Sequence, residues 1–226
     1  MIQGHDVICW GGGEFAQHGH QLIRGDVSYD KGQLSAPDIS GRVKLAACRS
    51  SHNIVVTVDD KIFAWGNNSS GQLGSRESSD GQSIVRLTLV PPPPDDATVV
   101  SVACGYRHTM IVMDNGHVYA CGNNFYAQLG YDFRKETYKE NQTFPGLLRY
   151  LVHNPVSQVS CGDKHTLFLY RSGAVAAVGQ NEHGQIGDGG RGESVVPKLV
   201  DLDCRVVSIS SGSNHNLAVV GRYKSC

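Results

Sequence analysis

The sequence lacks long apolar runs, an excess of charge of one sign, and paired cysteines of the CxxC type. Its 226 residues carry 20 Lys and Arg against 21 Asp and Glu, a formal net charge of -1. Proteins that bind nucleic acid through phosphate contacts usually carry a basic excess, so the composition disfavours a nucleic-acid partner. No stretch approaches the ~20 apolar residues of a membrane-spanning helix, which argues against a membrane protein.

The cysteines and the first residues indicate the compartment. Seven cysteines, an odd number without a CxxC pair, are typical of free thiols and not of a disulfide framework. Residues 1–15 have too short an apolar part and too much glycine to form a signal peptide. We therefore expect a cytoplasmic protein, with the nucleus as the alternative location.

Motifs typical of enzymes are also missing. The sequence has no Gly-x-Ser-x-Gly elbow, P-loop, zincin motif or dinucleotide fingerprint. It therefore predicts no catalytic residue, no cofactor and no metal, and favours a protein that is not an enzyme.

Glycine, at 27 residues, is abundant and regularly placed. A ten-residue pattern reads WGNNSSGQLG from Trp65, CGNNFYAQLG from Cys121 and VGQNEHGQIG from Val178. A degraded copy, WGGGEFAQHG, begins at Trp10. The first positions 10, 65, 121 and 178 are separated by 55, 56 and 57 residues, which is the spacing of an internal repeat.

A second pattern runs in phase with the first. It reads CRSSH from Cys48, CGYRH from Cys104, CGDKH from Cys161 and SGSNH from Ser211. Its histidines are separated by 56, 57 and 50 residues. Two independent patterns with one period identify a repeat protein that covers nearly the whole chain.

Each period contains short runs of β-forming residues. Predicted strands are 84–89, 99–103, 109–113, 118–121, 147–152 and 195–200. Asp114-Asn115-Gly116 lies between two of them and is a hairpin signal, and no long helical period stands out. The sequence therefore predicts an all-β protein in which each repeat holds three or four antiparallel strands, the content of one propeller blade.

The two patterns together resemble the repeats of the RCC1 (regulator of chromosome condensation) family, which implies a radial β-propeller. Such domains usually have seven blades, and this chain has material for about four, so we expect a partial or atypical propeller. One domain would span 1–226, with repeat units of approximately 41–95, 96–154, 155–204, and 1–40 combined with 205–226. The resemblance implies that the first and last strands, 7–11 and 215–220, complete one blade together.

The histidines of the second pattern recur once in each repeat, at His52, His108, His165 and His215. A metal site needs ligands within about 2.0–2.3 Å of one ion, whereas this spacing places each histidine in a different blade. We expect structural histidines that are buried and hydrogen-bonded to neighbouring backbone.

Between glycine and histidine the second pattern varies from repeat to repeat. A fixed frame with variable turns is typical of a scaffold that presents loops on one face. We predict that exposed residues of these turns form the partner-binding face: Tyr106, Arg107, Asp163, Lys164, Ser213 and Asn214.

Four consecutive prolines, Pro91, Pro92, Pro93 and Pro94, precede two aspartates. Such a run forms a stiff exposed connector, or alternatively a polyproline II ligand for SH3, WW or EVH1 domains.

The sequence predicts a non-catalytic scaffold for protein–protein interaction, which could assemble into a larger complex. One alternative is a guanine-nucleotide exchange factor for a small GTPase. In RCC1-type exchange factors for the GTPase Ran, an Asp just after this glycine contributes to exchange, and Asp163 matches that position. A second alternative is a substrate-recognition fragment of a ubiquitin ligase, since RCC1-like domains also occur in HECT ligases.

Overall fold

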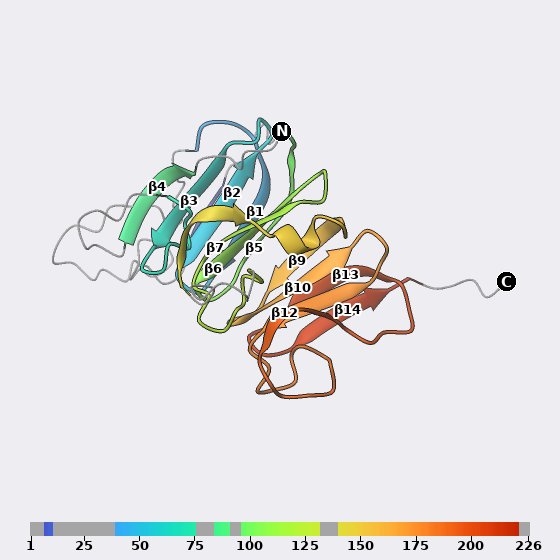
Figure 1. The fold of residues 1–226 in the computed structure, drawn as a ribbon. Coiled ribbons are helices and arrows are strands. Elements are labelled where there is room, and N and C mark those ends of the chain that lie inside the picture. The colour runs from blue at the N-terminus through green and yellow to red at the C-terminus, as the bar shows by residue number, and fades with distance from the viewer. Residues whose placement is uncertain (1–6, 11–38, 76–83, 91–95, 132–139, 222–226) are drawn as a thin grey trace.

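The structure is a computed structural model that describes residues 7–10, 39–75, 84–90, 96–131 and 140–221. In these ranges the chain forms four antiparallel sheets that follow one another along an arc (Figure 1). The all-β prediction is confirmed, and the arrangement is that of a partial propeller with one sheet per repeat.

Three sheets have four strands each, in chain order. The first contains β1 (Val43–Arg49), β2 (His52–Thr57), β3 (Ile62–Asn67) and β4 (Ile84–Val90). The second contains β5 (Val99–Cys104), β6 (His108–Met113), β7 (Val118–Gly122) and β8 (Gln142–Leu147). The third contains β9 (Val156–Cys161), β10 (His165–Tyr170), β11 (Val175–Gly179) and β12 (Ser194–Leu199). The fourth sheet contains β13 (Val206–Ser211) and β14 (Asn216–Val220).

The strand predicted over 147–152 is wrong. The fourth strand of the second sheet, β8, ends at Leu147, and a 3-10 turn, η1 (Arg149–Leu151), follows. Leu148 and Leu151 are both buried in the core. Because they are three residues apart, one helical turn buries both, whereas an extended strand would point them to opposite faces.

The hydrophobic core lies between successive sheets. Three apolar clusters are each formed by side chains of two successive repeats. In the first of them Ile62 and Leu73 pack with Ile111 and Tyr119 of the next repeat. A sheet in this fold therefore needs its neighbour to cover its apolar face.

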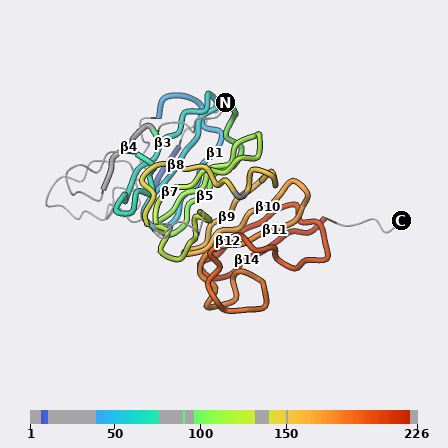
Figure 2. The backbone as a smooth tube through the Cα atoms, viewed as in Figure 1, coloured from blue at the N-terminus to red at the C-terminus, as the bar shows by residue number. Residues whose placement is uncertain are grey.

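The first strand of every sheet lines the inner side of the arc. In the backbone tube of Figure 2, β1, β5 and β9 follow one another, and β13 contacts β9. A cavity of about 420 Å³ lies between these strands, and its lining includes Leu45, Ser101, Gln158 and Val207. Because the inner strands contact one another, the turns at their ends also meet.

The two ends of the arc are not joined in the described residues. Residues 7–10 line a pocket with β1 and β2, whereas β14 lies in the last sheet, beyond the third (Figure 1). The blade that the sequence predicts from the two ends together stays a prediction, since among the described residues β14 pairs with β13 alone.

A repeated hydrogen-bond chain joins each sheet to the next. The Nε2 atoms of His52 and His108 lie 2.9 and 3.0 Å from the hydroxyls of Thr109 and Thr166 in the following repeat. The Thr166 hydroxyl in turn donates to the carbonyl oxygen of Gln128 at 2.7 Å. A hydroxyl has one proton to donate, so it must accept from the histidine, which fixes the Nε2–H tautomer of the neutral ring.

The histidines depart from the expectation in two ways, because their partners are Thr and Asn side chains of the next repeat and not neighbouring backbone, and because the last of them is not buried. His165 still contacts the next repeat, with Nε2 2.7 Å from Oδ1 of Asn216, and His52, His108 and His165 are buried. His215 occupies the equivalent position but is exposed. Its ring is uncovered because no further repeat packs against the last sheet in the described residues.

Replacement of Thr166 by Val tests this chain. We expect T166V to lower the free energy of unfolding by about 1–3 kcal/mol, because it leaves His108 Nε2 and the Gln128 carbonyl without their buried partner. H215A is the matched control and should change stability by less than about 0.5 kcal/mol. Denaturant titration measures the free energy of unfolding of both variants. Equal effects would mean that the hydrogen-bond chain through Thr166 does not stabilise the fold.

The same histidines make stability depend on pH. Burial lowers the pKa of His52 to about 4 and that of His108 to about 3. Because the folded values lie below the ordinary 6.5, the unfolded chain takes up protons first as the pH falls.

We therefore expect the free energy of unfolding to decrease between pH 7 and pH 5, a window above the titration of most carboxylates. The H108Q variant should show a smaller decrease than wild type in denaturant titrations at both values. An identical decrease would mean that His108 does not contribute.

Candidate functional site

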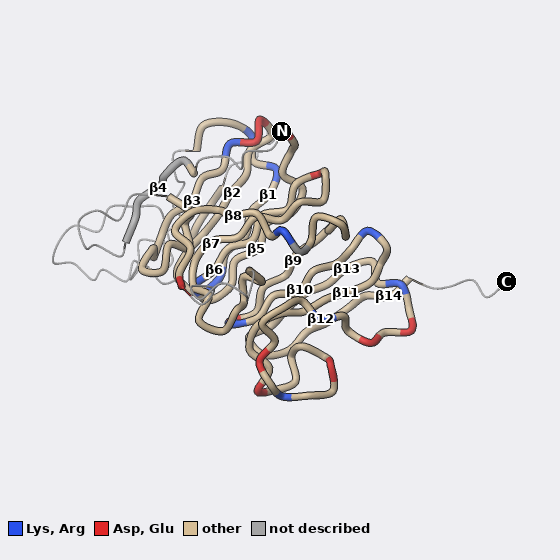
Figure 3. Tube along the Cα trace, in the orientation of Figure 1, with Lys and Arg blue, Asp and Glu red and all other residues tan. Residues whose placement is uncertain are grey.

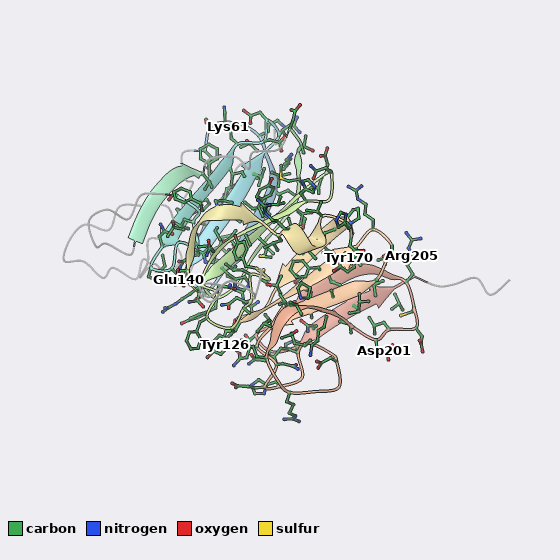
Figure 4. All side chains as sticks on the ribbon, in the orientation of Figure 1. Lys61, Tyr126, Glu140, Tyr170, Asp201 and Arg205 are labelled. Atoms are coloured by element: carbon green, nitrogen blue, oxygen red, sulfur yellow. The ribbon has the colours of Figure 1, made fainter. Side chains whose placement is uncertain are left out.

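Two sets of loops form one face of the molecule, here called the turn face. It consists of the turns between the first and second strands and the loops that follow the third strands. Backbone bonds join the two sets within each repeat, with Asn123 N donating to Arg107 O at 2.7 Å and Gln180 N donating to Lys164 O at 2.9 Å. In Figure 4, Tyr126 lies at this end, and Lys61 and Arg205 lie toward the opposite end.

The ten-residue pattern folds into a loop fixed by its own amides. In the second repeat, Asn124 Oδ1 accepts from Leu129 N at 2.8 Å, and Gln128 Nε2 donates to Asn123 Oδ1 at 2.8 Å. Asn68 and Asn181 make the corresponding bonds in the other complete repeats. These contacts explain the repeated Asn and Gln residues, and of the three residues between Asn124 and Gln128 the first two, 125 and 126, are free to vary.

The predicted turn residues come together in a row. Tyr106 N donates to Asp163 O at 3.2 Å, and Asp163 N donates to Ser213 O at 3.1 Å. Successive turns are thus joined directly through their backbones. Tyr106, Arg107, Ser213 and Asn214 are exposed, whereas Asp163 and Lys164 are half-buried.

Glycine in the second pattern makes room for the histidine. A Cβ atom at Gly162 would overlap the ring of His165, and Gly105 meets His108 in the same way. In the first repeat Arg49 stands at this position. There Ser50 adopts a left-handed conformation, with φ of 56°, so the turn follows a different path.

From this position the Arg49 side chain extends across the inner side of the arc. Its Nε and Nη2 donate to Asp163 Oδ1 at 3.0 and 2.8 Å. Its guanidinium also donates to the Ser211 carbonyl oxygen at 3.3 Å and to the Ser213 hydroxyl at 3.2 Å. One side chain of the first repeat thereby connects the third and fourth repeats.

The role expected for Asp163 changes as a result. The sequence predicts an exposed turn residue, but its carboxylate is held in a partly buried ion pair. Hydrogen bonds between two charged groups are stronger than neutral ones. Asp163 is therefore part of the frame that holds the turns together.

Aromatic rings gather beside the second and third turns. Tyr106 is 43% exposed and Phe125 is 60% exposed. The Arg107 guanidinium lies 5.5 Å from the Tyr106 ring centroid, and Lys164 Nζ lies 4.6 Å from that of Tyr126. The face thus combines rigid apolar area with two cationic groups.

Phe125 and Tyr126 were missed from sequence. They occupy variable positions of the ten-residue pattern, just as Tyr106 and Arg107 occupy variable positions of the second pattern. Their rings pack edge to face with centroids 5.0 Å apart, which fixes the orientation of both.

Charge is dispersed over the described surface. Figure 3 shows Lys and Arg interspersed with Asp and Glu along the loops. Within the described ranges, no group of three or more His, Cys, Asp or Glu side chains could hold a metal ion. No described helix is long and apolar enough to cross a membrane. Pro91, Pro92, Pro93 and Pro94 lie outside the described residues.

A double-mutant cycle with R49A and D163N tests the ion pair. We expect a coupling energy of about 1 kcal/mol, more than an exposed pair contributes, because Arg49 is held by several acceptors. The coupling should fall in ~1 M salt.

The exposed pair Lys61–Asp59, with Nζ and Oδ2 2.9 Å apart, is the control and should show no measurable coupling. Thermal or denaturant unfolding measures both cycles. Zero coupling between Arg49 and Asp163 would show that their ion pair does not stabilise the fold.

Comparison with known proteins places this geometry in a family. The family model "Regulator of chromosome condensation (RCC1) repeat" matches residues 59–112, 115–169 and 172–219. A second model of the same description matches residues 43–72, 99–128 and 156–185. Together these matches cover most of the chain.

Relatives and solved structures agree with this result. The chain is 31% identical over 224 residues to the ultraviolet-B receptor UVR8 of Arabidopsis thaliana, covering 98% of this chain and 48% of that protein. It is 31% identical over 262 residues to the probable E3 ubiquitin-protein ligase HERC4 of Homo sapiens, covering 94% of this chain and 24% of that protein. Yeast RCC1 (Prp20), solved bound to Kap60, superimposes with a TM-score of 0.84 at 20% identity, covering 97% of this chain and 51% of that one.

Proposed function

Because the chain belongs to the regulator of chromosome condensation (RCC1) repeat family, we propose that it is a non-catalytic scaffold that binds another protein through the turn face. The observation that carries the proposal is the pair of exposed aromatic residues, Tyr106 and Phe125, mounted on loops that the repeat frame holds rigid. The chain spans about half the length of UVR8 and about a quarter of that of HERC4. Any partner or activity that this chain shares with those whole proteins is therefore a proposal.

The turn face has the chemistry of a binding hot spot. Aromatic residues and arginine are enriched where interfaces gain most of their energy, since they bring large apolar area and several donors with little loss of conformational freedom. Tyr126 and Lys164 already contact each other through ring and ammonium, and Nζ also lies 3.3 Å from the tyrosine oxygen. A preorganised surface of this kind loses little entropy on binding.

The charges favour a particular kind of partner surface. Arg49 neutralises Asp163, so Arg107 and Lys164 provide the charge beside the aromatic rings. Glu182 and His183 stand at the equivalent loop positions of the third repeat and are exposed. We therefore infer that the partner presents an apolar patch with carboxylates on the side that meets the second repeat.

The exchange-factor alternative depends on Asp163. Its carboxylate would have to act on a GTPase while Oδ1 accepts two bonds from Arg49. Breaking that contact costs energy before any exchange begins, so the geometry favours binding over exchange. The ligase-fragment alternative needs only recognition, which the same face would supply.

The proposal is tested by capture of partners from native cells, with mass spectrometry for identification. We expect the Y106A/F125A double variant to bind the captured partner at least about tenfold more weakly, the loss expected for hot-spot residues. Both residues are exposed, so the melting temperature should remain close to that of wild type.

The matched control is V58A/K61A at the opposite end of the sheets, where both residues are also exposed. It should bind as wild type does. Equal affinity of both double variants would move the interface away from the turn face, and turnover of a substrate by the purified chain would contradict a non-catalytic role.

A further inference from the structure

The loop between β11 and β12, part of the turn face, carries a glycine-rich segment around one arginine. The segment reads GDGGRGES from Gly187 to Ser194. Of all the arginines in the sequence, only Arg191 has glycine on both sides. Glycine has no side chain that would crowd its neighbour, and its backbone adopts conformations that other residues avoid. Arg191 is therefore the arginine whose backbone fits most easily into the groove of an enzyme.

The segment projects from the sheets. Residues 187–193 are all exposed, whereas Ser194 at the start of β12 is buried. In Figure 1 the orange loop that leads into β12 extends beyond the strands of the third sheet. A Cβ atom at Gly192 would meet no other atom within 4 Å. The space beside Arg191 is therefore open to a second protein.

Asp188 fixes the base of this loop. Its Oδ1 accepts from Gly190 N at 3.0 Å and from Asn181 Nδ2 at 3.1 Å. Its Oδ2 accepts from Lys198 Nζ at 2.6 Å. Because both carboxylate oxygens are already bonded, Asp188 holds the loop outward and leaves Arg191 without an ion pair to it.

The Arg191 guanidinium is not held by the rest of the protein. Arg49 is paired with Asp163, and Arg107 lies over the ring of Tyr106. Among the described residues, by contrast, the Arg191 side chain makes no hydrogen bond, ion pair or ring contact. Its N–H donors face solvent, so its entry into the pocket of an enzyme breaks no contact within this chain.

We propose that Arg191 is a site of N-methylation by an arginine methyltransferase. A terminal guanidinium nitrogen attacks the methyl carbon of the sulfonium donor S-adenosylmethionine. The N–C bond forms as the C–S bond breaks, the electron pair of that bond stays on sulfur as a neutral thioether, and the nitrogen loses one proton to a base of the enzyme. The product keeps its positive charge and loses N–H donors, so methylation blocks two-pronged hydrogen bonding to a carboxylate.

Methyl transfer to the folded 226-residue chain tests the proposal. The chain is incubated with a recombinant arginine methyltransferase that forms asymmetric dimethylarginine, together with S-adenosylmethionine that carries a deuterated methyl group. Peptide mapping by mass spectrometry locates the label, which we expect on Arg191 in wild type and nowhere in R191K. R42K is the matched control, because Arg42 is also exposed and follows a glycine but precedes Val43. It should be labelled at Arg191 as wild type is.

The variant G192A tests the need for glycine without disturbing the fold. Gly192 does not adopt a left-handed conformation, and the added Cβ meets nothing within 4 Å. The melting temperature should therefore equal that of wild type, while labelling of Arg191 falls several-fold because the methyl group meets the wall of the enzyme's groove.

A synthetic peptide of residues 187–196 shows whether the enzyme accepts the segment by itself, and it should be labelled. A labelled peptide with an unlabelled folded chain would mean that the fold withholds Arg191 from the enzyme, which overturns the proposal. Label mainly on other arginines, or G192A labelled as fully as wild type, would do the same. Peptide mapping of the chain purified from its native cells should find methylated Arg191, and an unmodified Arg191 in that sample would also overturn the proposal.

Discussion

Each repeat is held to the next by a histidine whose Nε2–H reaches a Thr or Asn side chain of the following sheet. The hydroxyl of Thr109 or Thr166 passes the hydrogen bond on to the Gln carbonyl of the preceding loop, 2.7 Å away in both cases. The histidine of the second pattern and the Gln-Leu-Gly of the ten-residue pattern thus belong to one hydrogen-bonded unit, which the Thr or Asn of the next repeat completes. Where no following sheet exists, at His215, the unit is incomplete and the side chain is exposed.

This constraint separates the frame from the working surface. The histidine and the glutamine of this unit recur in every complete repeat, and the residues between the fixed positions differ from repeat to repeat. The differences collect on the turn face, where Tyr106, Arg107, Phe125 and Tyr126 give the second repeat a surface unlike that of the others. Arg49 and Asp163 are an intermediate case, because they vary between repeats and yet hold the inner turns together.

Much of the fold could be predicted from the sequence because two patterns shared one period. The periodic glycines and histidines indicated repeats, and hairpin signals such as Asp114-Asn115-Gly116 placed the strands. The strand predicted at 147–152 was wrong because the burial of Leu148 and Leu151 depends on the neighbouring sheet. The ion pair from Arg49 to Asp163 joins residues 114 apart in sequence, and nothing local to either residue indicates it.

Hydrogen exchange of the chain, alone and with the captured partner, tests the central claim that a histidine-linked frame carries a binding surface on the turn face. The account predicts slow exchange in β6 and β10, and slowing on binding at residues 106–107 and 125–126. The hairpins at 59–60 and 114–116, at the other end of the sheets, should be unchanged. Slowing at those hairpins with an unchanged turn face would contradict the account.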